Sequence, residues 1–172
     1  MDFTTLEQLA GNPAYTLKAQ QAYFRLRLKR REESRVTTSP CWLPCDDEGN
    51  LLRANESGYT QRVIVQPSGA ANRSGQGGLR ITAYVHQLGW WQKSRFNPVV
   101  VQSYRAMVQR GLPMVVSHLC HNSRCFRPSH LTVEPRWVNE YRRICLLKRG
   151  GQACHCHYSR RGRPWRYKTC LT

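Results

Sequence analysis

The segment SHLCHNSRCFRPSHL, residues 117–131, concentrates three histidines and two cysteines in fifteen residues. Within it, Cys120, Cys125 and His130 follow one another with four intervening residues each time. A structural zinc ion takes four protein ligands at the corners of a tetrahedron, and cysteine and histidine are its usual ligands. The segment therefore predicts three ligands of one zinc site, with the fourth supplied by another part of the chain.

The fourth ligand is expected from CWLPCDDEGN (41–50), a segment that we predict to be rich in turns. It offers Cys41 and Cys45, and either would tie the N-terminal part of the chain to the later segment. The N-terminus, MDFTTLEQLA, has no basic region before an apolar run, so we expect no secretory signal. Outside the oxidising secretory route, cysteines mixed with histidines are more typical of metal sites than of disulfides.

A second group of candidate ligands lies near the C-terminus, in a stretch too polar to fold around a core of its own. Four ligands suffice for a zinc ion, and a segment without a core usually needs the metal to fold. Cys145, Cys154 and Cys170 are the preferred ligands, and the fourth is left open between Cys156 and His157. The full group comprises Cys145, Cys154, His155, Cys156, His157 and Cys170.

Hydrophobic periodicity predicts short strands that alternate with helices. The predicted strands are 58–66, the first part of 79–91, and 112–120. The predicted helices are 18–35, the second part of 79–91, 97–111 and 134–150, and the polar segment 67–78 is predicted to be a loop. This pattern indicates one small α+β domain.

The formal net charge of +17 indicates a polyanionic partner, and nucleic acid is the first expectation. A two-stranded β-ribbon fits the major groove of DNA, where glutamine and arginine read adenine and guanine. Gln61, Arg62 and Gln66 on the first predicted strand are the candidate readers. We do not find the aromatic stacking platform expected of a reader of single-stranded RNA. The basic helix predicted over 18–35 suits phosphate contacts or nuclear import, and we expect a nuclear protein. No apolar run approaches the roughly 18 residues of a membrane span.

His118 is left over once the zinc ligands have been counted. A neutral imidazole near physiological pH is suited to act as a general base, although a buried structural histidine is an alternative. Asn139 lies on the predicted helix 134–150, which is expected to pack back over the strand that ends near His118. An amide oxygen together with phosphate oxygens and waters would complete the octahedron that Mg²⁺ prefers. The pair therefore favours a hydrolytic site.

These residues closely resemble the His-Cys box homing endonucleases of the ββα-metal (His-Me finger) superfamily. The resemblance rests on SHLCHNSRCFRPSHL, on Asn139, and on the terminal cysteine and histidine cluster, and it spans roughly residues 41–170. Cys41-Trp42 and Gly58-Tyr59…Arg62 resemble a pattern of related nucleases.

The resemblance implies a role for each matching residue. His118 would be the general base, Asn139 the protein ligand of one catalytic Mg²⁺, and Cys41 the fourth ligand of the first zinc site. Arg62 would contact the scissile phosphate; because one extra residue separates it from the preceding glycine, Arg80 remains an alternative. The spacing of the second zinc site departs most from the family pattern.

The family acts as homodimers on double-stranded DNA, so a homodimer is expected here as well. The chain ends two residues after Cys170, and we therefore expect its dimer interface to lie elsewhere than in a C-terminal tail.

The combined expectation is a small zinc-stabilised α+β fold with an antiparallel DNA-binding sheet and a ββα-metal active-site motif. Its expected parts are a basic helical extension (1–40), a recognition region (41–111), a catalytic core (112–150) and a second zinc segment (151–172). The expected function is that of a site-specific, Mg²⁺-dependent DNA endonuclease holding two structural Zn²⁺ ions, with neither a membrane nor a small-molecule substrate. The alternative is a zinc-folded DNA-binding protein without catalysis.

Overall fold

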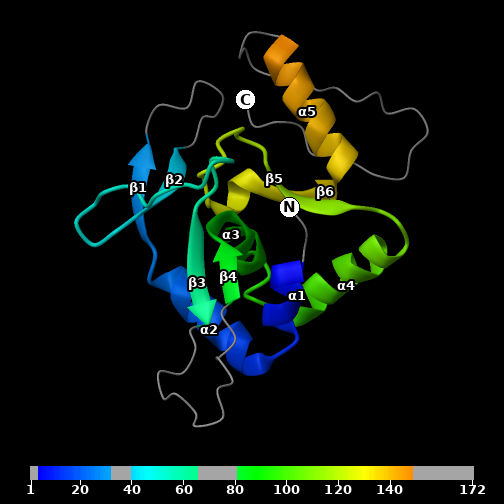
Figure 1. Ribbon diagram of the computed structural model, residues 1–172, viewed down its shortest axis with the longest axis horizontal. Coiled ribbons are helices and arrows are strands. Elements are labelled where there is room, and N and C mark those ends of the chain that lie inside the picture. The colour runs from blue at the N-terminus through cyan, green and yellow to red at the C-terminus, as the bar shows by residue number, and fades with distance from the viewer. Residues whose placement is uncertain (1–3, 32–39, 66–80, 149–172) are drawn as a thin grey trace.

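The computed structural model describes residues 4–31, 40–65 and 81–148, which form an α+β fold (Figure 1). Its strands pair into three separate antiparallel two-stranded sheets. The helices are α1 (Thr4–Ala10), α2 (Pro13–Phe24), α3 (Val85–Gln92), α4 (Pro98–Gln109) and α5 (Arg136–Lys148), with a 3₁₀ turn at Pro128–His130. The strands are β1 (Arg27–Arg31), β2 (Cys41–Cys45), β3 (Gln61–Val65), β4 (Ile81–Tyr84), β5 (Met114–His118) and β6 (Leu131–Pro135). The expected α+β class is confirmed.

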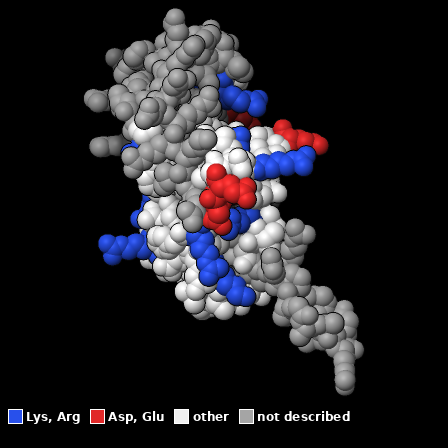
Figure 2. All heavy atoms as spheres, turned by 90° about the vertical axis from the view of Figure 1, so that its left-hand side faces the viewer, with Lys and Arg blue, Asp and Glu red and all other residues white. Residues whose placement is uncertain are grey.

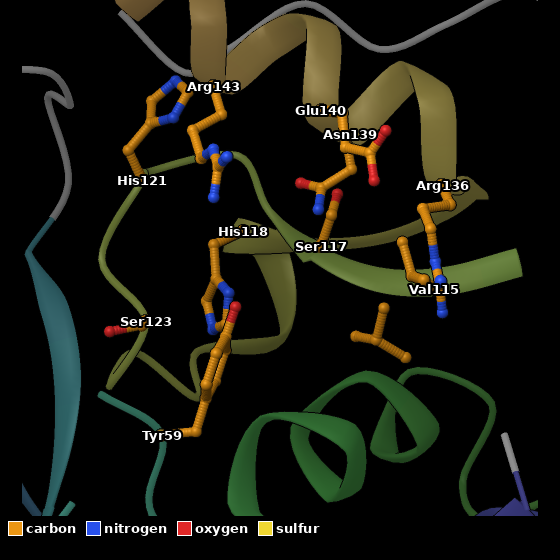
Figure 3. A pocket seen from close by; sticks show the side chains of 11 residues that line it. Tyr59, Val115, Ser117, His118, His121, Ser123, Arg136, Asn139, Glu140 and Arg143 are labelled. Atoms are coloured by element: carbon orange, nitrogen blue, oxygen red, sulfur yellow. The ribbon is translucent and has the colours of Figure 1, made fainter. Parts of the chain in front are cut away.

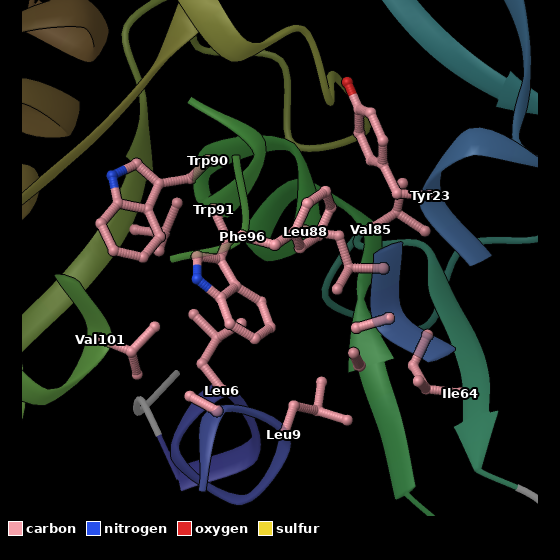
Figure 4. Packing of buried hydrophobic residues seen from close by; sticks show 14 of the residues in the cluster. Leu6, Leu9, Tyr23, Ile64, Val85, Leu88, Trp90, Trp91, Phe96 and Val101 are labelled. Carbon is pink, nitrogen blue, oxygen red and sulfur yellow. The ribbon is translucent and has the colours of Figure 1, made fainter. Parts of the chain in front are cut away.

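The main core lies where α1, α3 and α4 meet the β3–β4 pair (Figure 4). Leu6 and Leu9 of α1 pack with Leu88 and Trp91 of α3, and all four side chains are fully buried. Burial of such a side chain contributes about 1.5–3 kcal/mol to stability. The N-terminal residues that were expected to form a basic extension therefore supply part of the core.

The helix predicted over 18–35 is wrong for residues 25–31, and residues 32–35 lie outside the described residues. The side chain of Asn12 caps α2 by accepting a hydrogen bond from the Ala14 amide (2.9 Å), and α2 ends at Phe24. Residues 27–31 instead form β1, which pairs with β2 in the register Arg31↔Cys41. The sequence RLRLKRR (25–31) alternates leucine with basic residues, and this period of two favours a strand.

The segment 41–45 is likewise a strand and not a turn. Cys41, Leu43 and Cys45 point to one face of β2 and are buried, and Pro44 on the other face is buried as well. The turn follows at Asp46–Gly49, where Gly49 adopts a φ of +84°.

The β3–β4 pair confirms the expected antiparallel sheet, with Gln61↔Tyr84 and Arg62↔Ala83 opposite one another and a register shift between Val63 and Val65. β4 runs directly into α3, as predicted for 79–91. Gln66, Arg80 and the predicted loop between them lie outside the described residues.

The strands β5 and β6 and the helix α5 form a ββα unit. β5 and β6 pair from Met114↔Pro135 to His118↔Leu131, and α5 begins directly after β6 and packs on both strands. The helix predicted over 97–111 is confirmed as α4, and the chain turns after it at Gly111, whose φ is +82°. In the described part of the chain, no helix combines the length and the apolar character needed to cross a membrane.

Candidate metal centre and active site

Four buried side chains meet where the loop between β5 and β6 contacts β2. The ligand atoms of Cys41, Cys120, Cys125 and His130 all lie within 4.8 Å of one another. His130 Nδ1 is 3.8 Å from Cys41 Sγ and 3.6 Å from Cys125 Sγ. A tetrahedral zinc ion with its usual bond lengths would hold its ligand atoms about 3.5–3.8 Å apart. The donor set and its spacing therefore fit a structural zinc ion.

The thiols of this cluster compete for protons. Hydrogen bonds lower the pKa of Cys41, with the larger effect from Cys120 and the next from Cys125. The pKa of Cys120 is instead raised by its hydrogen bonds with Cys125 and Cys41. Three buried thiols cannot all ionise unless a cation offsets their negative charge. Zinc is a cation that prefers thiolate and imidazole together, so the chemistry of the donors agrees with their geometry.

Strand geometry explains why Cys41, and not Cys45, joins the cluster. Both side chains are buried, but four residues of a β-strand span about 13 Å, so only one of them can reach the site. Further contacts fix this end of β2 against the loop. The Phe126 amide donates to the Trp42 carbonyl (3.0 Å), and Arg127 Nη1 donates to the Pro40 carbonyl (2.9 Å).

His118, the last residue of β5, is hydrogen-bonded to the protein backbone and not to the thiols of the cluster. Its Nε2 lies 2.9 Å from the backbone carbonyl oxygen of Cys125. A carbonyl only accepts, so Nε2 carries the hydrogen of a neutral ring and the lone pair is on Nδ1. Burial lowers the pKa of His118 to about 4, with the Cys125 bond acting in the opposite direction. The imidazole is therefore an unprotonated base at neutral pH.

Aromatic rings surround His118 on the side away from α5. The ring of His86, on α3, is centred 4.8 Å from that of His118, and Tyr59 lies 5.1 Å from His86 and 5.9 Å from His118. Within the described residues, neither ring nitrogen of His86 has a hydrogen-bond partner, and burial holds its pKa well below the usual value. His86 was not expected from the sequence, because its contact with His118 is long-range and leaves no local signal.

The loop that carries the zinc ligands also positions Tyr59. Ser123 Oγ donates to the Gly58 carbonyl at 2.8 Å. Gly58 has a φ of +79°, and a Cβ at this position would lie 2.9 Å from Ser123 Oγ. Glycine is therefore required here both for its conformation and for the close approach of the loop.

A pocket of about 360 Å³ opens between β5 and α5, with His118 on one wall (Figure 3). The opposite wall is one face of α5, formed by Arg136, Asn139, Glu140 and Arg143. Among the described residues the Asn139 side chain has no hydrogen-bond partner, so its amide is available to a ligand. The remaining lining residues are Tyr59, Val115, Val116, Ser117, His121 and Ser123.

His118 and Asn139, which were paired from the sequence, both line this pocket. Arg136, Glu140 and Arg143 were missed. The two arginines lie three residues before and four residues after Asn139, and this spacing was a usable signal, since residues three and four apart share a helix face.

A buried ion pair fixes α5 relative to the β5–β6 hairpin. Arg142 Nη2 pairs with Glu134 Oε2, and both side chains are only 4% exposed. The other carboxylate oxygen of Glu134 accepts a hydrogen bond from Ser117 Oγ at 2.6 Å. Ser117 precedes His118, and Arg142 is three residues after Asn139. This network therefore connects the backbone positions of His118 and Asn139.

Other predicted site residues lie elsewhere. Gln61 is exposed on β3, and its neighbour Arg62 is half-buried and does not line the pocket. Cys145 falls in α5 where only the backbone is described, and the other candidate ligands of the second zinc site lie outside the described residues.

Comparison with known protein families yields a match over most of the chain. Residues 40–170 match a family model described as the zinc-binding loop region of homing endonuclease. This range contains the four clustered ligands as well as His118 and Asn139. Neither a curated protein nor a solved structure matches the chain.

Proposed function

The chain belongs to the homing endonuclease family defined by this zinc-binding loop region, and on that premise we propose that it is a site-specific double-strand DNA endonuclease. The proposal rests on the pocket that His118 and Asn139 line together. Nδ1 of His118 carries no proton, and the amide of Asn139 makes no hydrogen bond with the described residues. A purely structural zinc loop requires neither group.

In the proposed reaction, His118 Nδ1 takes a proton from a water molecule, and the resulting hydroxide attacks the scissile phosphorus. The bond from phosphorus to the 3′-oxygen breaks, and the leaving 3′-oxygen takes up a proton from solvent to become a hydroxyl group. General-base catalysis of this kind typically contributes about 10²–10⁴-fold to the rate. The hydrogen bond from Nε2 to Cys125 supports this role, because it holds the ring in the tautomer that accepts a proton at Nδ1.

Asn139 would hold Mg²⁺ through its amide oxygen. This residue fits the ion, since Mg²⁺ prefers hard oxygen ligands and usually keeps several waters and phosphate oxygens around one or two protein ligands. When bound, Mg²⁺ supplies Lewis-acid stabilisation of the negative charge on the phosphate and on the leaving oxygen.

The zinc ions are proposed to be structural. One would be held by Cys41, Cys120, Cys125 and His130, and a second by four of the terminal candidates Cys145, Cys154, Cys156, His157 and Cys170. The first ion would fix the loop whose Cys125 carbonyl orients His118.

DNA recognition is proposed for the β3–β4 sheet. Gln61 and Gln66 would read base edges in the major groove, and Arg62 or Arg80 would contact the phosphate backbone. A near-palindromic target would be cut by a homodimer in the nucleus.

Incubation of the purified protein with long genomic DNA, with and without Mg²⁺, tests this function. Discrete fragments that require Mg²⁺ are expected. His118→Ala should lower the cleavage rate by about 10²–10⁴-fold while DNA affinity and zinc content remain unchanged. If the wild-type protein binds DNA with high affinity but cuts none, the protein is a non-catalytic DNA-binding relative.

A further inference from the structure

The helix α5 presents more than Asn139 to the pocket. Arg136, Asn139 and Arg143 are spaced by three and four residues, so they form one stripe along the helix. At 1.5 Å per residue the two arginines are about 10 Å apart along the axis. Phosphates of one DNA strand recur about every 3.4 Å along the duplex axis. The stripe is therefore long enough to meet more than one phosphate of the same strand.

Both arginines of the stripe are exposed, and among the described residues neither takes part in a hydrogen bond or ion pair through its side chain. Arg142, next to Arg143, is in the opposite situation, since it is buried against Glu134. Glu140 also lines the pocket and carries a negative charge, but the two guanidinium groups outweigh it. The pocket wall is thus a cationic surface with free hydrogen-bond donors.

Arg143 is the arginine directed at the reacting side of the pocket. In Figure 3 its guanidinium group points from α5 toward His118, whereas Arg136 lies at the other end of the pocket beside Val115. The positive charge of Arg143 also acts on Tyr59, where it opposes the rise in pKa that burial causes. Its electric field therefore reaches the ring that packs against His118.

We propose that Arg143 binds the phosphate that is cleaved and that Arg136 binds another phosphate of the same strand. The inference rests on the proposed nuclease function and adds an arginine from α5 to the site, distinct from Arg62 on β3. A guanidinium group offers two parallel N–H donors to phosphate oxygens, so Arg143 would stabilise the charge that develops during attack by water. Arg136, which is farther from His118, would contribute mainly to binding.

The test compares four variants: Arg143→Ala, Arg143→Lys, Arg136→Ala and, as a control, Arg110→Ala. Arg110 is an exposed arginine at the end of α4 that does not line the pocket. Single-turnover cleavage is measured at saturating concentrations of a genomic fragment that the wild-type protein cuts. Affinity for a 30-base-pair duplex is measured without Mg²⁺ over a range of salt concentrations.

Arg143→Ala is expected to slow cleavage at saturation by about 10²–10³-fold, and Arg143→Lys, which keeps the charge but loses the two-pronged contact, should be intermediate. Arg136→Ala should weaken binding while leaving the rate at saturation within a few-fold of wild type. Each Ala variant in the stripe should also reduce the slope of log affinity against log salt by about 1. Arg110→Ala should change the rate by less than two-fold.

A wild-type rate for Arg143→Ala, or an unchanged salt slope, would overturn the assignment of Arg143 to the scissile phosphate. The failure of the proposed function would look different, because the wild-type protein itself would then cut no DNA. In that case the salt slopes still decide whether Arg143 and Arg136 contact phosphates.

Discussion

His118 and His130 belong to the same short segment but have different roles, because a different ring nitrogen of each makes the contact with neighbouring residues. His130 directs Nδ1 at the thiols of Cys41 and Cys125, where a metal would bind. His118 directs Nε2 at a carbonyl, which leaves Nδ1 to accept a proton. Counting ligands in the sequence separates the two histidines, but the tautomer of His118 follows only from the folded loop.

The two cysteines of β2 provide a matched pair of variants for the first zinc site. Cys41→Ser should lower the zinc content by one ion per chain and reduce thermal stability, because Cys41 belongs to the buried cluster. Cys45→Ser, at a buried position on the same strand but outside the cluster, should retain the wild-type zinc content. Elemental analysis of both purified proteins is the measurement. Equal zinc loss from the two variants would contradict the assignment of Cys41 as the fourth ligand.

At the scale of elements, the ββα unit was predictable because its signals are local. The apolar strand, the ligand spacing and the helix with proline at its start and glycine beyond its end all lie within residues 112–150. The β1–β2 ribbon was missed although RLRLKRR (25–31) alternates leucine with basic residues, which is a local signal for a strand. The dense positive charge of this run favoured a solvated helix instead, and the partner strand β2 begins only at Cys41.

The buried pair of Glu134 and Arg142 should be an important link between α5 and the hairpin. Glu134→Gln removes the carboxylate that pairs with the buried Arg142, and breaking a buried pair in this way typically costs about 3–5 kcal/mol of stability. Glu7→Gln is the matched control, because Glu7 and Arg105 are 3.9 Å apart with side chains 24% and 56% exposed. An exposed pair of this kind is worth about 1 kcal/mol or less. Chemical denaturation of both variants measures the free energy of unfolding that each one loses. Similar losses would show that the buried pair contributes no more to stability than the exposed pair.

The packing of α3 against the zinc-binding loop depends on Gly89. A Cβ at this position would overlap the Phe126 carbonyl oxygen and lie 3.1 Å from Leu131 Cδ1. In an open helix, Gly→Ala usually stabilises by about 0.5–1 kcal/mol. Gly89→Ala should instead destabilise the protein by about 1–3 kcal/mol, as expected of overpacking. A higher melting temperature for this variant would contradict the close approach of α3 to the loop.

At the scale of the whole molecule, the formal net charge is +17. Figure 2 shows separate lysine and arginine side chains across one face, with acidic side chains among them. Such a surface suits binding to DNA that depends largely on phosphate contacts.

Affinity for DNA should therefore fall steeply with salt. A protein that neutralises six to ten phosphates loses about 10³–10⁵-fold in affinity between 50 and 200 mM salt. Titration of a labelled duplex at several KCl concentrations measures the slope, with sucrose at equal osmolality as the control. A slope near zero would contradict an electrostatic mode of binding.

The zinc-binding cluster and the main core are separate units of packing. Cys41, Leu43, Cys120 and Cys125 form their own buried group, whereas the larger one is supplied by the helices α1 to α4 and the strands β3 to β6, with Phe126 as its contribution from the zinc-binding loop. Removal of zinc is therefore expected to open β2 and the loop 119–130 while the main core stays folded. The same opening would release the Cys125 carbonyl from His118 Nε2.

Removal of zinc with a chelator that binds Zn²⁺ far more tightly than Mg²⁺ tests whether the zinc ion controls the orientation of His118. Hydrogen exchange of residues 41–45 and 119–130 should accelerate by at least about 100-fold, a loss of about 3 kcal/mol of local protection. Exchange in α1 and α3 should change little. Cleavage should stop even when excess Mg²⁺ is present and should return only with Zn²⁺, because the zinc site holds the loop that orients His118. Full cleavage by the zinc-free protein would show that the orientation of His118 does not depend on the metal.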